Sequence, residues 1–502
     1  MTGERRVERP GERPLAEAEP PPLRAGWVAS AMNGALVTGD VSRTLASVSI
    51  DTRTLAPGDL FVAIRGERFD GAQFAAAAID AGAAGVVVPR GWWTAAAGAN
   101  ARGAASPDPS VPRSGGGPPA VIEVDDTTAA LQALARAIRR DSGAKVVAIT
   151  GSAGKTTTKE ATSELLSTRY RVIRNRGNFN NHIGLPLSLV ELRRRPEIAV
   201  VELGMNHAGE ISTLVRIAEP EVRVWTNVGD AHVGFFASVD AIADAKAEIF
   251  EGARPSDLLV ANADDARIEA RLPAFAGRVS TFGIERDADI RAATVADRGI
   301  DGTNARVTTP RGAVQVSTSL VGRGNLENLL AAIGVAIEFD VPLEDIAAAS
   351  ARLRPASHRG EIVRLHDGVT VIDDSYNANP TATKAALDVL ASSAAARRIA
   401  VIGEMLELGD QSAELHAMVG RAAARAGLDL LLTVGGRPAG ALADAAVAAG
   451  MNASHVRHLA TSEDAADAAA ASVGAGDLVL VKGSRGIRTD RVVDRLKTAW
   501  GG

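Results

Sequence analysis

The sequence predicts an α/β protein of three domains, and three observations lead to that prediction. A length of 502 residues exceeds what one hydrophobic core usually organises, so roughly two to four domains are expected. Short apolar runs alternate with Ala-rich segments, which is typical of strands followed by helices in mostly parallel sheets. One apolar run leads into the glycine-containing turn Gly151 to Thr158, which is typical of a phosphate-binding loop.

Composition restricts the classes of function. Hydrophobic residues make up 46% of the chain and aromatic residues only 3%, so Ala, Val, Leu and Ile must build the cores. The net charge of -5 gives no broad basic surface for nucleic acid or for an anionic membrane. There is no cysteine, which excludes disulfides and thiolate-bound metals and fits a reducing compartment. No stretch approaches the roughly 18 to 20 apolar residues of a membrane span. We expect a cytoplasmic protein whose partners are small molecules, with neither nucleic acid binding nor membrane insertion.

The sequence of the N-terminal part is typical of a tail followed by a small α/β domain. Residues 1–24 carry charges and prolines throughout and lack the apolar core of a secretory signal, so a disordered tail is expected. Two short β-rich runs then flank a Pro-Gly turn, and an Ala-rich helix is expected over 74–84. We assign this domain to 25–142. A flexible insertion is predicted at 94–119, where Ala, Gly, Ser and Pro show no periodicity, before a strand at 121–124.

The rest of the chain predicts two further α/β domains. A central domain, 143–350, has apolar runs that end in polar or glycine residues at 199–204, 222–229 and 257–264. Ligands bind at such carboxyl ends of strands in parallel sheets, so the chemistry is expected along them. The alternation restarts in 351–502 with the runs VTVIDD, RIAVIGEM, LLLTVGG and DLVLVKG, which predict a smaller third domain.

The phosphate loop is the strongest local signal. Backbone N–H groups at a helix N-terminus bind phosphate oxygens, Lys155 adds a positive charge, and Thr156 can hold Mg²⁺. The spacing is Gly-x-x-Gly-Lys-Thr, because Ile149 stands where the common eight-residue pattern has its first glycine. The alternative is a glycine turn beside a surface lysine, and the strand before it and the helix after it argue against that.

Magnesium between two phosphates needs oxygen or imidazole ligands near such a loop. Glu202 and His232 are candidates because each follows an apolar strand, although either could be an ordinary polar residue at a strand end. Lys246 lies in DAIADAKAEIF, a helix whose other faces are Ala, Ile and Phe, where an ammonium group is costly to bury. Periodicity alone therefore favours a Lys246 side chain that extends to water.

Two polar loops mark the third domain. The segment DDSYNANP can orient a substrate through hydrogen bonds, or it can simply be a turn of the kind that Asn and Asp favour. KGSRG offers cationic side chains suited to a carboxylate or phosphate. The polar members of these loops are Asp373, Asp374, Tyr376, Asn377, Asn379, Lys482 and Arg485.

Taken together and in order, these segments resemble the Mur ligase family of peptidoglycan synthesis, from about Ser47 to Leu496. The matching segments are IDTRTLAPGDLFVAIRGERFDG, TGSAGKTTTKE, GNFNNHIGLPLSL, VELGMNHAGEI, NVGDAHVGFFASVDAIADAKAEIF, GRGNLENLLAA, DDSYNANP, GEMLELG and VKGSRG. The resemblance implies an N-terminal domain that holds a UDP-sugar, a central ATPase domain with a mostly parallel sheet, and a Rossmann-like C-terminal domain that closes over the site.

The resemblance also implies roles for individual residues. The expected ATP loop comprises Gly151, Ser152, Ala153, Gly154, Lys155, Thr156 and Thr157. Thr156 and Glu202 are expected to hold one magnesium ion and His232 and Lys246 a second, with Lys246 carbamylated so that it resembles a carboxylate. Asn325 and Asn328 match an adenine-contacting pair, and Arg359 matches an arginine that reaches the nucleotide phosphates. The family commonly has a histidine where this chain has Gly324.

The expected substrate residues lie in several of the matching segments. Asp51, Thr52 and Arg53 match a UDP-sugar loop, and the others are Asn181, Asn206, Tyr376, Asn377, Asn379, Lys482 and Arg485. Lys155, Lys246 and Asp374 are expected to take part in catalysis.

The implied reaction is amide formation driven by ATP and Mg²⁺. The terminal carboxyl of UDP-N-acetylmuramoyl-tripeptide becomes an acyl phosphate, and the amine of D-alanyl-D-alanine attacks it. DDSYNANP and GNFNNHIGLP favour this reaction over addition of a single amino acid, as by a related Mur ligase or a folylpolyglutamate-synthase-like enzyme. A silent UDP-sugar sensor is a further alternative, but it has little need for Lys155, Glu202, His232 and Lys246 together. Lysine and diaminopimelate stay open as the third residue of the tripeptide, and a monomer is expected.

Overall fold

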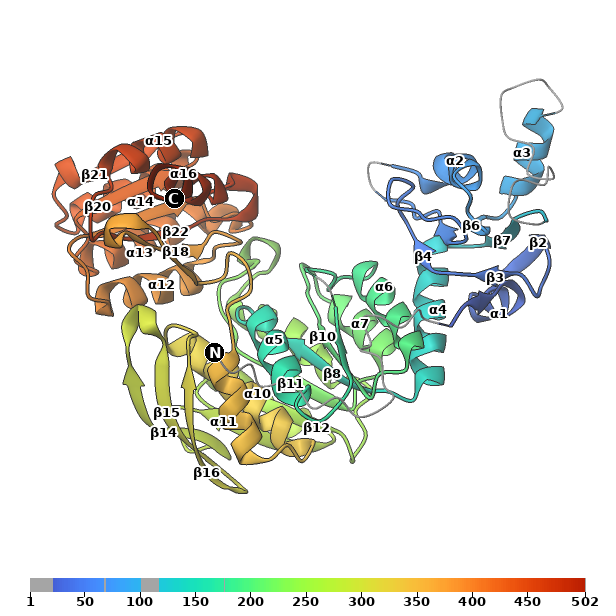
Figure 1. Ribbon diagram of the computed structural model, residues 1–502, viewed down its shortest axis with the longest axis horizontal. Helices are drawn as coiled ribbons and strands as arrows, with labels where there is room; N and C mark the ends of the chain where they lie inside the picture. Colours follow the sequence, from blue (N-terminus) through green and yellow to red (C-terminus); the bar gives the residue numbers. More distant parts are fainter. Residues whose placement is uncertain (1–20, 67–68, 101–116, 176, 502) are drawn as a thin grey trace, which may run out of the picture. The chain divides into compact units, whose positions relative to one another are not determined.

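The computed structural model describes residues 21–66, 69–100, 117–175 and 177–501 (Figure 1). The chain divides into two compact units. The first comprises Met1–Val146, Tyr170–Leu203 and Thr213–Glu219, and the second comprises Val147–Arg169, Gly204–Ser212 and Pro220–Gly502. The domain boundaries predicted at 142/143 and 350/351 do not coincide with these units and stay predictions.

The first unit contains a five-stranded sheet in the order β2-β7-β6-β5-β4, parallel except for the edge strand β2. Its strands are β2 (Ala35–Thr38), β4 (Val48–Ser49), β5 (Leu60–Val62), β6 (Gly85–Pro89) and β7 (Ala120–Val124). Its helical segments are α1 (Ala25–Ala31), η1 (Gly71–Phe74), α2 (Ala75–Asp80), α3 (Trp92–Asn100) and α4 (Thr127–Ser142). The helix predicted over 74–84 corresponds to α2, which is shorter because a turn separates its end from β6.

Two predictions about this unit need correction. The predicted tail reached Arg24, but β1 (Leu23–Arg24) pairs antiparallel with β3 (Thr44–Leu45), where Leu23 is buried. The predicted flexible insertion began at Thr94, yet α3 continues through its first residues to Asn100. Residues 1–20 of the tail and 101–116 of the insertion lie outside the described residues.

Helix α4 shows how sequence and fold agree in this unit. The Asp126 side chain accepts hydrogen bonds from the backbone N–H groups of Thr128 and Ala129 and so caps the helix, and Gly143 ends it at a φ of 69°. The remaining elements of the unit include β9 (Val172–Arg174) and β10 (Ile198–Glu202), which pair in parallel. Near them in the sequence are α6 (Gly184–Val190), η2 (Glu191–Arg194) and α7 (Glu210–Ala218).

The second unit begins with a sheet in the order β16-β15-β14-β13-β12-β11-β8. Its strands are β8 (Lys145–Thr150), β11 (Val222–Trp225), β12 (Leu258–Asn262), β13 (Arg278–Gly283), β14 (Ile290–Asp297), β15 (Thr303–Thr309) and β16 (Gly312–Thr318). Strands β8 to β14 pair in parallel, as predicted, whereas β15 and β16 add an antiparallel extension that the sequence reading did not foresee. The parallel core strands β11 and β12 are buried along their whole length, as expected for a sheet covered on both faces.

Helices and short turns connect these strands. They are α5 (Lys155–Leu166), η3 (Val233–Phe235), α8 (Val239–Ala247), η4 (Glu248–Phe250), α9 (Ala266–Glu269), η5 (Leu272–Ala274), η6 (Gly299–Asp301), α10 (Arg323–Glu338) and α11 (Leu343–Arg352). Helix α10 is buried from Asn328 to Ala336 and packs along α5, the helix that follows the phosphate loop (Figure 1).

The second sheet of this unit has the order β17-β18-β22-β19-β20-β21 and is parallel except for β17. Its strands are β17 (Glu361–Arg364), β18 (Thr370–Asp374), β19 (Arg398–Gly403), β20 (Leu430–Val434), β21 (Val456–Leu459) and β22 (Leu478–Lys482). Its helical segments are η7 (His366–Gly368), α12 (Pro380–Ser392), η8 (Gly409–Gln411), α13 (Ser412–Arg425), α14 (Arg437–Ala448), η9 (Ala453–His455), α15 (Ser462–Ser472), η10 (Arg485–Ile487) and α16 (Asp490–Trp500). Helices α15 and α16 cover one face and α12, α13 and α14 the other (Figure 1), which is the predicted Rossmann-like arrangement.

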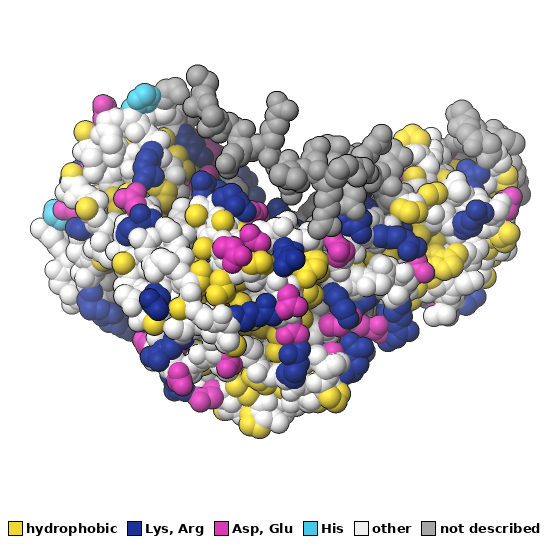
Figure 2. All heavy atoms as spheres, turned by 60° about the horizontal axis from the view of Figure 1, so that its bottom comes forward, with side chains coloured by type: hydrophobic (Ala, Val, Ile, Leu, Met, Phe, Trp, Pro, Cys, Tyr) yellow, Lys and Arg dark blue, Asp and Glu magenta, His cyan; other side chains and the backbone are white. Residues whose placement is uncertain are grey.

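Among the described residues, every helix is too short or too polar to cross a lipid bilayer. Figure 2 shows Lys and Arg side chains interspersed with Asp and Glu over the visible face. This mixture agrees with the small net charge and with the expectation that anions are bound only locally.

Candidate active site

The phosphate loop joins the buried strand β8 to α5, and glycine is required at both of its glycine positions. A Cβ on Gly151 would lie 1.9 Å from Thr226 Oγ1, and one on Gly154 would lie 2.1 Å from Asn328 Oδ1. Gly154 also has a φ of 81°, which side chains other than hydrogen rarely tolerate. The turn that ends at Lys155, the first residue of α5, is therefore compact and closely packed by its neighbours.

Hydrogen bonds from the loop after β11 hold the phosphate loop in place. Asn227 receives Ser152 N–H at its carbonyl oxygen and Ala153 N–H at its side-chain oxygen, at 3.0 and 2.8 Å. The Ser152 hydroxyl donates to Gly229 O at 3.1 Å. Lys155 Nζ folds back to within 2.7 Å of Gly151 O, so its ammonium lies over the turn. Thr156 and Thr157 follow in the first helical turn and are half-buried. The loop is thus fixed before any ligand arrives.

Two asparagines of α10 form a chain of hydrogen bonds, and one of them, Asn328, reaches the helix that follows this loop. Asn328 accepts a hydrogen bond from Thr158 Oγ1 at 3.2 Å and donates one to Asn325 Oδ1 at 3.2 Å. Asn325 in turn donates to Val321 O at 2.9 Å. The structure therefore brings the predicted adenine pair next to the phosphate loop.

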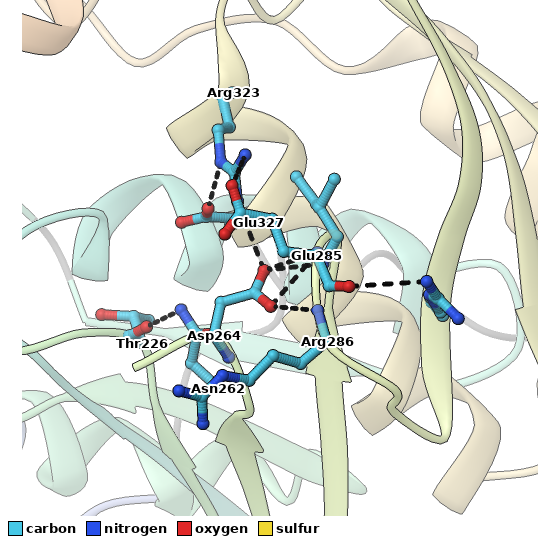
Figure 3. A network of polar contacts seen from close by, with 9 residues as sticks. Thr226, Asn262, Asp264, Glu285, Arg286, Arg323 and Glu327 are labelled. Carbon is cyan, nitrogen blue, oxygen red and sulfur yellow. Dashed lines mark hydrogen bonds and ion pairs between the residues drawn. The ribbon is translucent and has the colours of Figure 1, made fainter. Parts of the chain in front are cut away.

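A polar cavity of about 310 Å³ lies beside the N-terminus of α10. Its lining residues are Asn227, Asn262, Asp264, Asp265, Ala266, Arg267, Glu285, Arg323 and Glu327. Figure 3 shows how four of them converge. Arg323 contacts Glu285 at 2.7 Å, Glu327 at 3.0 Å and Asp264 at 3.4 Å.

Two carboxyl groups of this cavity have pKa values shifted in opposite directions. Burial raises the pKa of Glu327, against the opposing effect of Arg323. Burial acts in the same direction on Asp264, but the backbone N–H groups of Arg286, Ile284 and Glu285 outweigh it and lower the pKa of that carboxyl overall. The sequence reading missed Asp264, Glu285, Arg323 and Glu327. The only available signal was the polar end of the strand at 257–264, because the charge network itself depends on tertiary contacts.

His232 follows β11 in the loop that contacts the phosphate loop, in a left-handed conformation with a φ of 64°. Its Nδ1 lies 2.6 Å from Glu407 Oε2, within ion-pair distance, although the two groups are not aligned as a hydrogen bond. This contact lowers the pKa of the Glu407 carboxyl, while partial burial acts in the opposite direction. Glu407 lies in the GEMLELG segment, and the sequence alone predicted no role for it.

Lys246 lies on α8 with only 2% of its surface exposed, so the side chain does not extend to water as helix periodicity alone favoured. Burial, and then the positive charge of Lys155, lower the pKa of its ammonium well below the usual value. No hydrogen bond or ion pair of Lys246 is found among the described residues. Across all the residues that the structure describes, no cluster of three or more His, Asp or Glu side chains is arranged to hold a metal.

Several predicted residues lie in the first unit. Glu202 ends β10, is buried, and accepts a hydrogen bond from Asn180 Nδ2 at 3.4 Å. Asn181 Oδ1 accepts from Gly184 N, the first residue of α6, at 2.8 Å. The association of Glu202 with Thr156 stays a prediction.

The predicted UDP-sugar loop also lies in the first unit, directly after β4. Arg53 pairs with Asp51 at 2.6 Å and thereby lowers the pKa of that carboxyl to about 2, and Thr52 between them is half-buried. Asn206, in the second unit, is exposed, and its backbone N–H donates to Glu210 at 2.7 Å. These contacts of Asp51, Arg53 and Asn206 are all with other protein groups, so the substrate roles of these residues stay predictions.

In the second sheet, the ends of β18 and β22 meet. The buried Lys482 donates to Asp374 Oδ2 at 2.6 Å and to Asn377 O at 2.9 Å, so two of its three donors are already used. This contact supports the DDSYNANP loop, and the expected role of Lys482 as a substrate ligand stays a prediction. Asn379 accepts from Ala382 N at 2.8 Å and caps α12, the turn-forming role that was the alternative for this loop.

Tyr376 brings the two predicted arginines together. Arg359 stacks on its ring with the guanidinium carbon 4.0 Å from the ring centroid, and Arg485 lies 5.9 Å away. His358, which the sequence reading missed, contacts the buried Asp373 through Nδ1 at 2.7 Å. No motif in the sequence marked His358.

A parallel sheet with a supported phosphate loop, followed in the chain by a Rossmann-like sheet, is the arrangement of a nucleotide-binding α/β protein. Three family models match the chain: "Mur ligase family, catalytic domain" over 44–139, "Mur ligase middle domain" over 149–336 and "Mur ligase, glutamate ligase domain" over 358–485. The chain belongs to the Mur ligase family.

Similar proteins cover nearly the whole chain. A UDP-N-acetylmuramoyl-tripeptide--D-alanyl-D-alanine ligase of Bacillus subtilis is 34% identical and covers 93% of this chain, with 97% of the relative covered. A crystal structure of MurF from Acinetobacter baumannii has a TM-score of 0.83 at 30% identity and covers 96% of this chain and 100% of its own. MurF ligase from Thermotoga maritima in complex with ADP has a TM-score of 0.76 at 28% identity, with 90% and 97% covered.

Proposed function

We propose that this chain joins D-alanyl-D-alanine to UDP-N-acetylmuramoyl-tripeptide, using ATP and passing through an acyl phosphate. The observation that carries the proposal is the preformed phosphate loop with Lys155 folded over it, in a chain that matches the Bacillus subtilis ligase over 93% of its length. We further propose the domain boundaries 25–142, 143–350 and 351–502, a monomer, and a cytoplasmic location.

The nucleotide site uses residues of the second unit. Loop residues 151–157 bind the phosphates through backbone N–H groups and the α5 N-terminus. Asn325 and Asn328 contact adenine, and the cavity around Arg323 takes the outer part of the nucleoside. Arg359 binds phosphate oxygens while it stays stacked on Tyr376, which limits the side-chain entropy lost on binding.

By this proposal Thr156 with Glu202 would hold one magnesium ion, and His232 with Lys246 would hold a second. The support for the second pair is chemical: a buried ammonium next to Lys155 is unfavourable, whereas a carbamate on Lys246 is an anion with oxygen donors that suit Mg²⁺. When bound, magnesium neutralises the charge that builds on the phosphate oxygens.

The reaction follows from the weakness of a carboxylate as an electrophile. The terminal carboxylate attacks the γ-phosphorus of ATP, the bond to the bridging oxygen breaks, and ADP leaves. The amine of D-alanyl-D-alanine then attacks the acyl carbon, loses a proton, and expels inorganic phosphate. Lys155 and the N-terminus of α5 stabilise negative charge during the first step, because they are held in place before it begins.

Asp374 is proposed to hold the incoming ammonium and to assist its deprotonation. Its Oδ2 pairs with Lys482, which keeps the carboxylate oriented at the end of β18. An Asp374→Asn variant leaves Lys482 with a neutral partner and is expected to turn over much more slowly. Unchanged turnover in that variant contradicts the role in proton transfer.

The substrates are proposed to bind on both units. Asp51, Thr52 and Arg53 contact the UDP-sugar, and the other polar residues near the substrates are Asn181, Asn206, Tyr376, Asn377, Asn379 and Arg485. Lys482, which also pairs with Asp374, is proposed to lie among these substrate contacts.

Phosphate release from ATP by the purified chain tests the proposal. We expect release only when UDP-muramoyl-tripeptide and D-alanyl-D-alanine are both present, and each substrate alone serves as the control. Tripeptides ending in lysine and in diaminopimelate are assayed side by side. Equal release with a single free amino acid in place of the dipeptide supports the related single-residue ligase instead.

A further inference from the structure

The loop that carries His232 is held from two sides. At its start, Gly229 exchanges hydrogen bonds with Ser152 of the phosphate loop: the Ser152 hydroxyl donates to Gly229 O at 3.1 Å, and Gly229 N donates back to that hydroxyl at 2.9 Å. One residue further on, Asp230 accepts a hydrogen bond from Thr381, near the start of α12, at 3.2 Å. The loop therefore connects the phosphate loop with the second sheet of the same unit.

The contact between His232 and Glu407 is the closest point of this junction. The Nδ1 to Oε2 distance is 2.6 Å, and Gly234 N donates to the Glu407 carbonyl at 3.0 Å. Both His232 and Glu407 have a positive φ, of 64° and 65°. A left-handed conformation costs roughly 1–2 kcal/mol for a residue with a side chain, so two facing residues of this kind indicate a functional constraint.

The backbones approach so closely that only glycine fits on both sides. A Cβ on Gly234 would lie 2.5 Å from Gly409 N, and one on Gly409 would lie 2.8 Å from Gly234 Cα. The two loops therefore pack backbone against backbone, and the contact does not depend on two long side chains alone.

The segment that presents Glu407 is itself rigidly supported. Met405 N donates to Nε2 of the buried His416 at 2.9 Å, and His416 Nδ1 lies 2.7 Å from Ser412 O. Leu406 N donates to Ser484 Oγ at 2.9 Å. Glu407 is therefore held at a defined place on the second sheet while its side chain remains 44% exposed.

We infer that Glu407 is a positioning residue for His232. Its carboxylate lies 2.6 Å from Nδ1 of the imidazole, which leaves Nε2 as the nitrogen available to a metal ion. Carboxylates that bind the far nitrogen of a metal-bound histidine fix the ring and raise its basicity. Glu407 lies in the loop that follows β19 of the second sheet. The His232 ring is therefore held for metal binding only when this loop contacts the loop at 229–236. The inference rests on the proposed role of His232 in metal binding.

The test uses the full chain with ADP and Mn²⁺ as the probe. Histidine is labelled with ¹⁵N, and the His232 signal is assigned from a His232→Gln variant. Ring ¹⁵N shifts report which nitrogen carries the proton, and paramagnetic broadening during a Mn²⁺ titration reports metal binding at this ring. The variants are Glu407→Gln, Glu407→Ala and the conservative Glu407→Asp. Glu414→Gln is the matched control, because Glu414 is 76% exposed and pairs only with Arg421 among the described residues.

In the parent we expect a proton on Nδ1 and broadening of the His232 signal at low Mn²⁺. Glu407→Gln and Glu407→Ala should show mixed tautomers and need roughly tenfold more Mn²⁺. Glu407→Asp should fall between them and the parent, and Glu414→Gln should match the parent. Unchanged half-saturation in both Glu407→Gln and Glu407→Ala overturns the inference and leaves the proposed ligase function standing. Absence of broadening in the parent contradicts the role of His232 and the inference with it, whereas failure of the proposed function shows separately as absent phosphate release.

Discussion

Replacing Gly154 by alanine should weaken both the fold and nucleotide binding, by amounts that the structure allows us to separate. The φ of 81° costs alanine roughly 1–2 kcal/mol. The new Cβ lies 2.1 Å from Asn328 Oδ1, so Asn328 must move and lose its hydrogen bonds with Thr158 and Asn325. At about 0.5–1.5 kcal/mol for each bond, the total loss is about 2–5 kcal/mol.

Gly252→Ala is the matched control for Gly154→Ala. Gly252 has a φ of 63°, but an added Cβ there meets no atom within 4 Å, so only the backbone cost applies. We expect urea denaturation to show a loss of about 1–2 kcal/mol for the control and a larger loss for Gly154→Ala. Calorimetry should give unchanged ADP affinity for the control and roughly tenfold or weaker affinity for Gly154→Ala, since about 1.4 kcal/mol corresponds to tenfold. Equal behaviour of the two variants in both assays refutes this reasoning.

Three other variants test separate parts of the structure. Lys246→Met replaces a buried amine by an apolar side chain of similar volume, so thermal stability without ligands should rise or stay level while turnover falls at least about 100-fold; retained turnover contradicts the metal role. Arg359→Lys loses the planar stack on Tyr376, and the KM for ATP should rise roughly fivefold, whereas Tyr376→Phe should leave it unchanged because the ring remains. Arg140 and then Arg136 lower the pKa of Glu219 from 4.5 to about 2, so the stability lost in Glu219→Gln should be full at neutral pH and shrink as pH falls from about 4.5 towards 2; a pH-independent difference contradicts the pairing.

The fold class followed from the sequence because it depends on local patterns. Buried parallel strands such as β8 and β12 are continuous apolar runs in the sequence. The glycines of the phosphate loop are recognisable in the sequence because the fold leaves no room for a Cβ atom at these positions. The antiparallel strands β15 and β16 were missed, because alternating residues at the edge of a sheet give a weaker signal than a buried run.

Individual site residues were harder to predict when their role depends on distant partners. The burial of Lys246 could not follow from helix periodicity, because it depends on how the neighbouring elements η4 and α9 pack against α8. The Asp374–Lys482 pair joins residues more than a hundred positions apart, so this contact could not be predicted from local patterns. Glu407 and His358 were passed over for the same reason: their partners, His232 and Asp373, are known only once the chain is folded.

The most direct test of the account follows one oxygen atom through the reaction. The terminal carboxyl of UDP-muramoyl-tripeptide is labelled with ¹⁸O, and the phosphate released in the presence of ATP and D-alanyl-D-alanine is analysed by mass spectrometry. An acyl phosphate passes one carboxyl oxygen to the phosphate when the amine displaces it, so we predict inorganic phosphate that carries one heavy oxygen for each amide bond formed. Amide formation with unlabelled phosphate, or labelled phosphate with no amide product, contradicts the central claim.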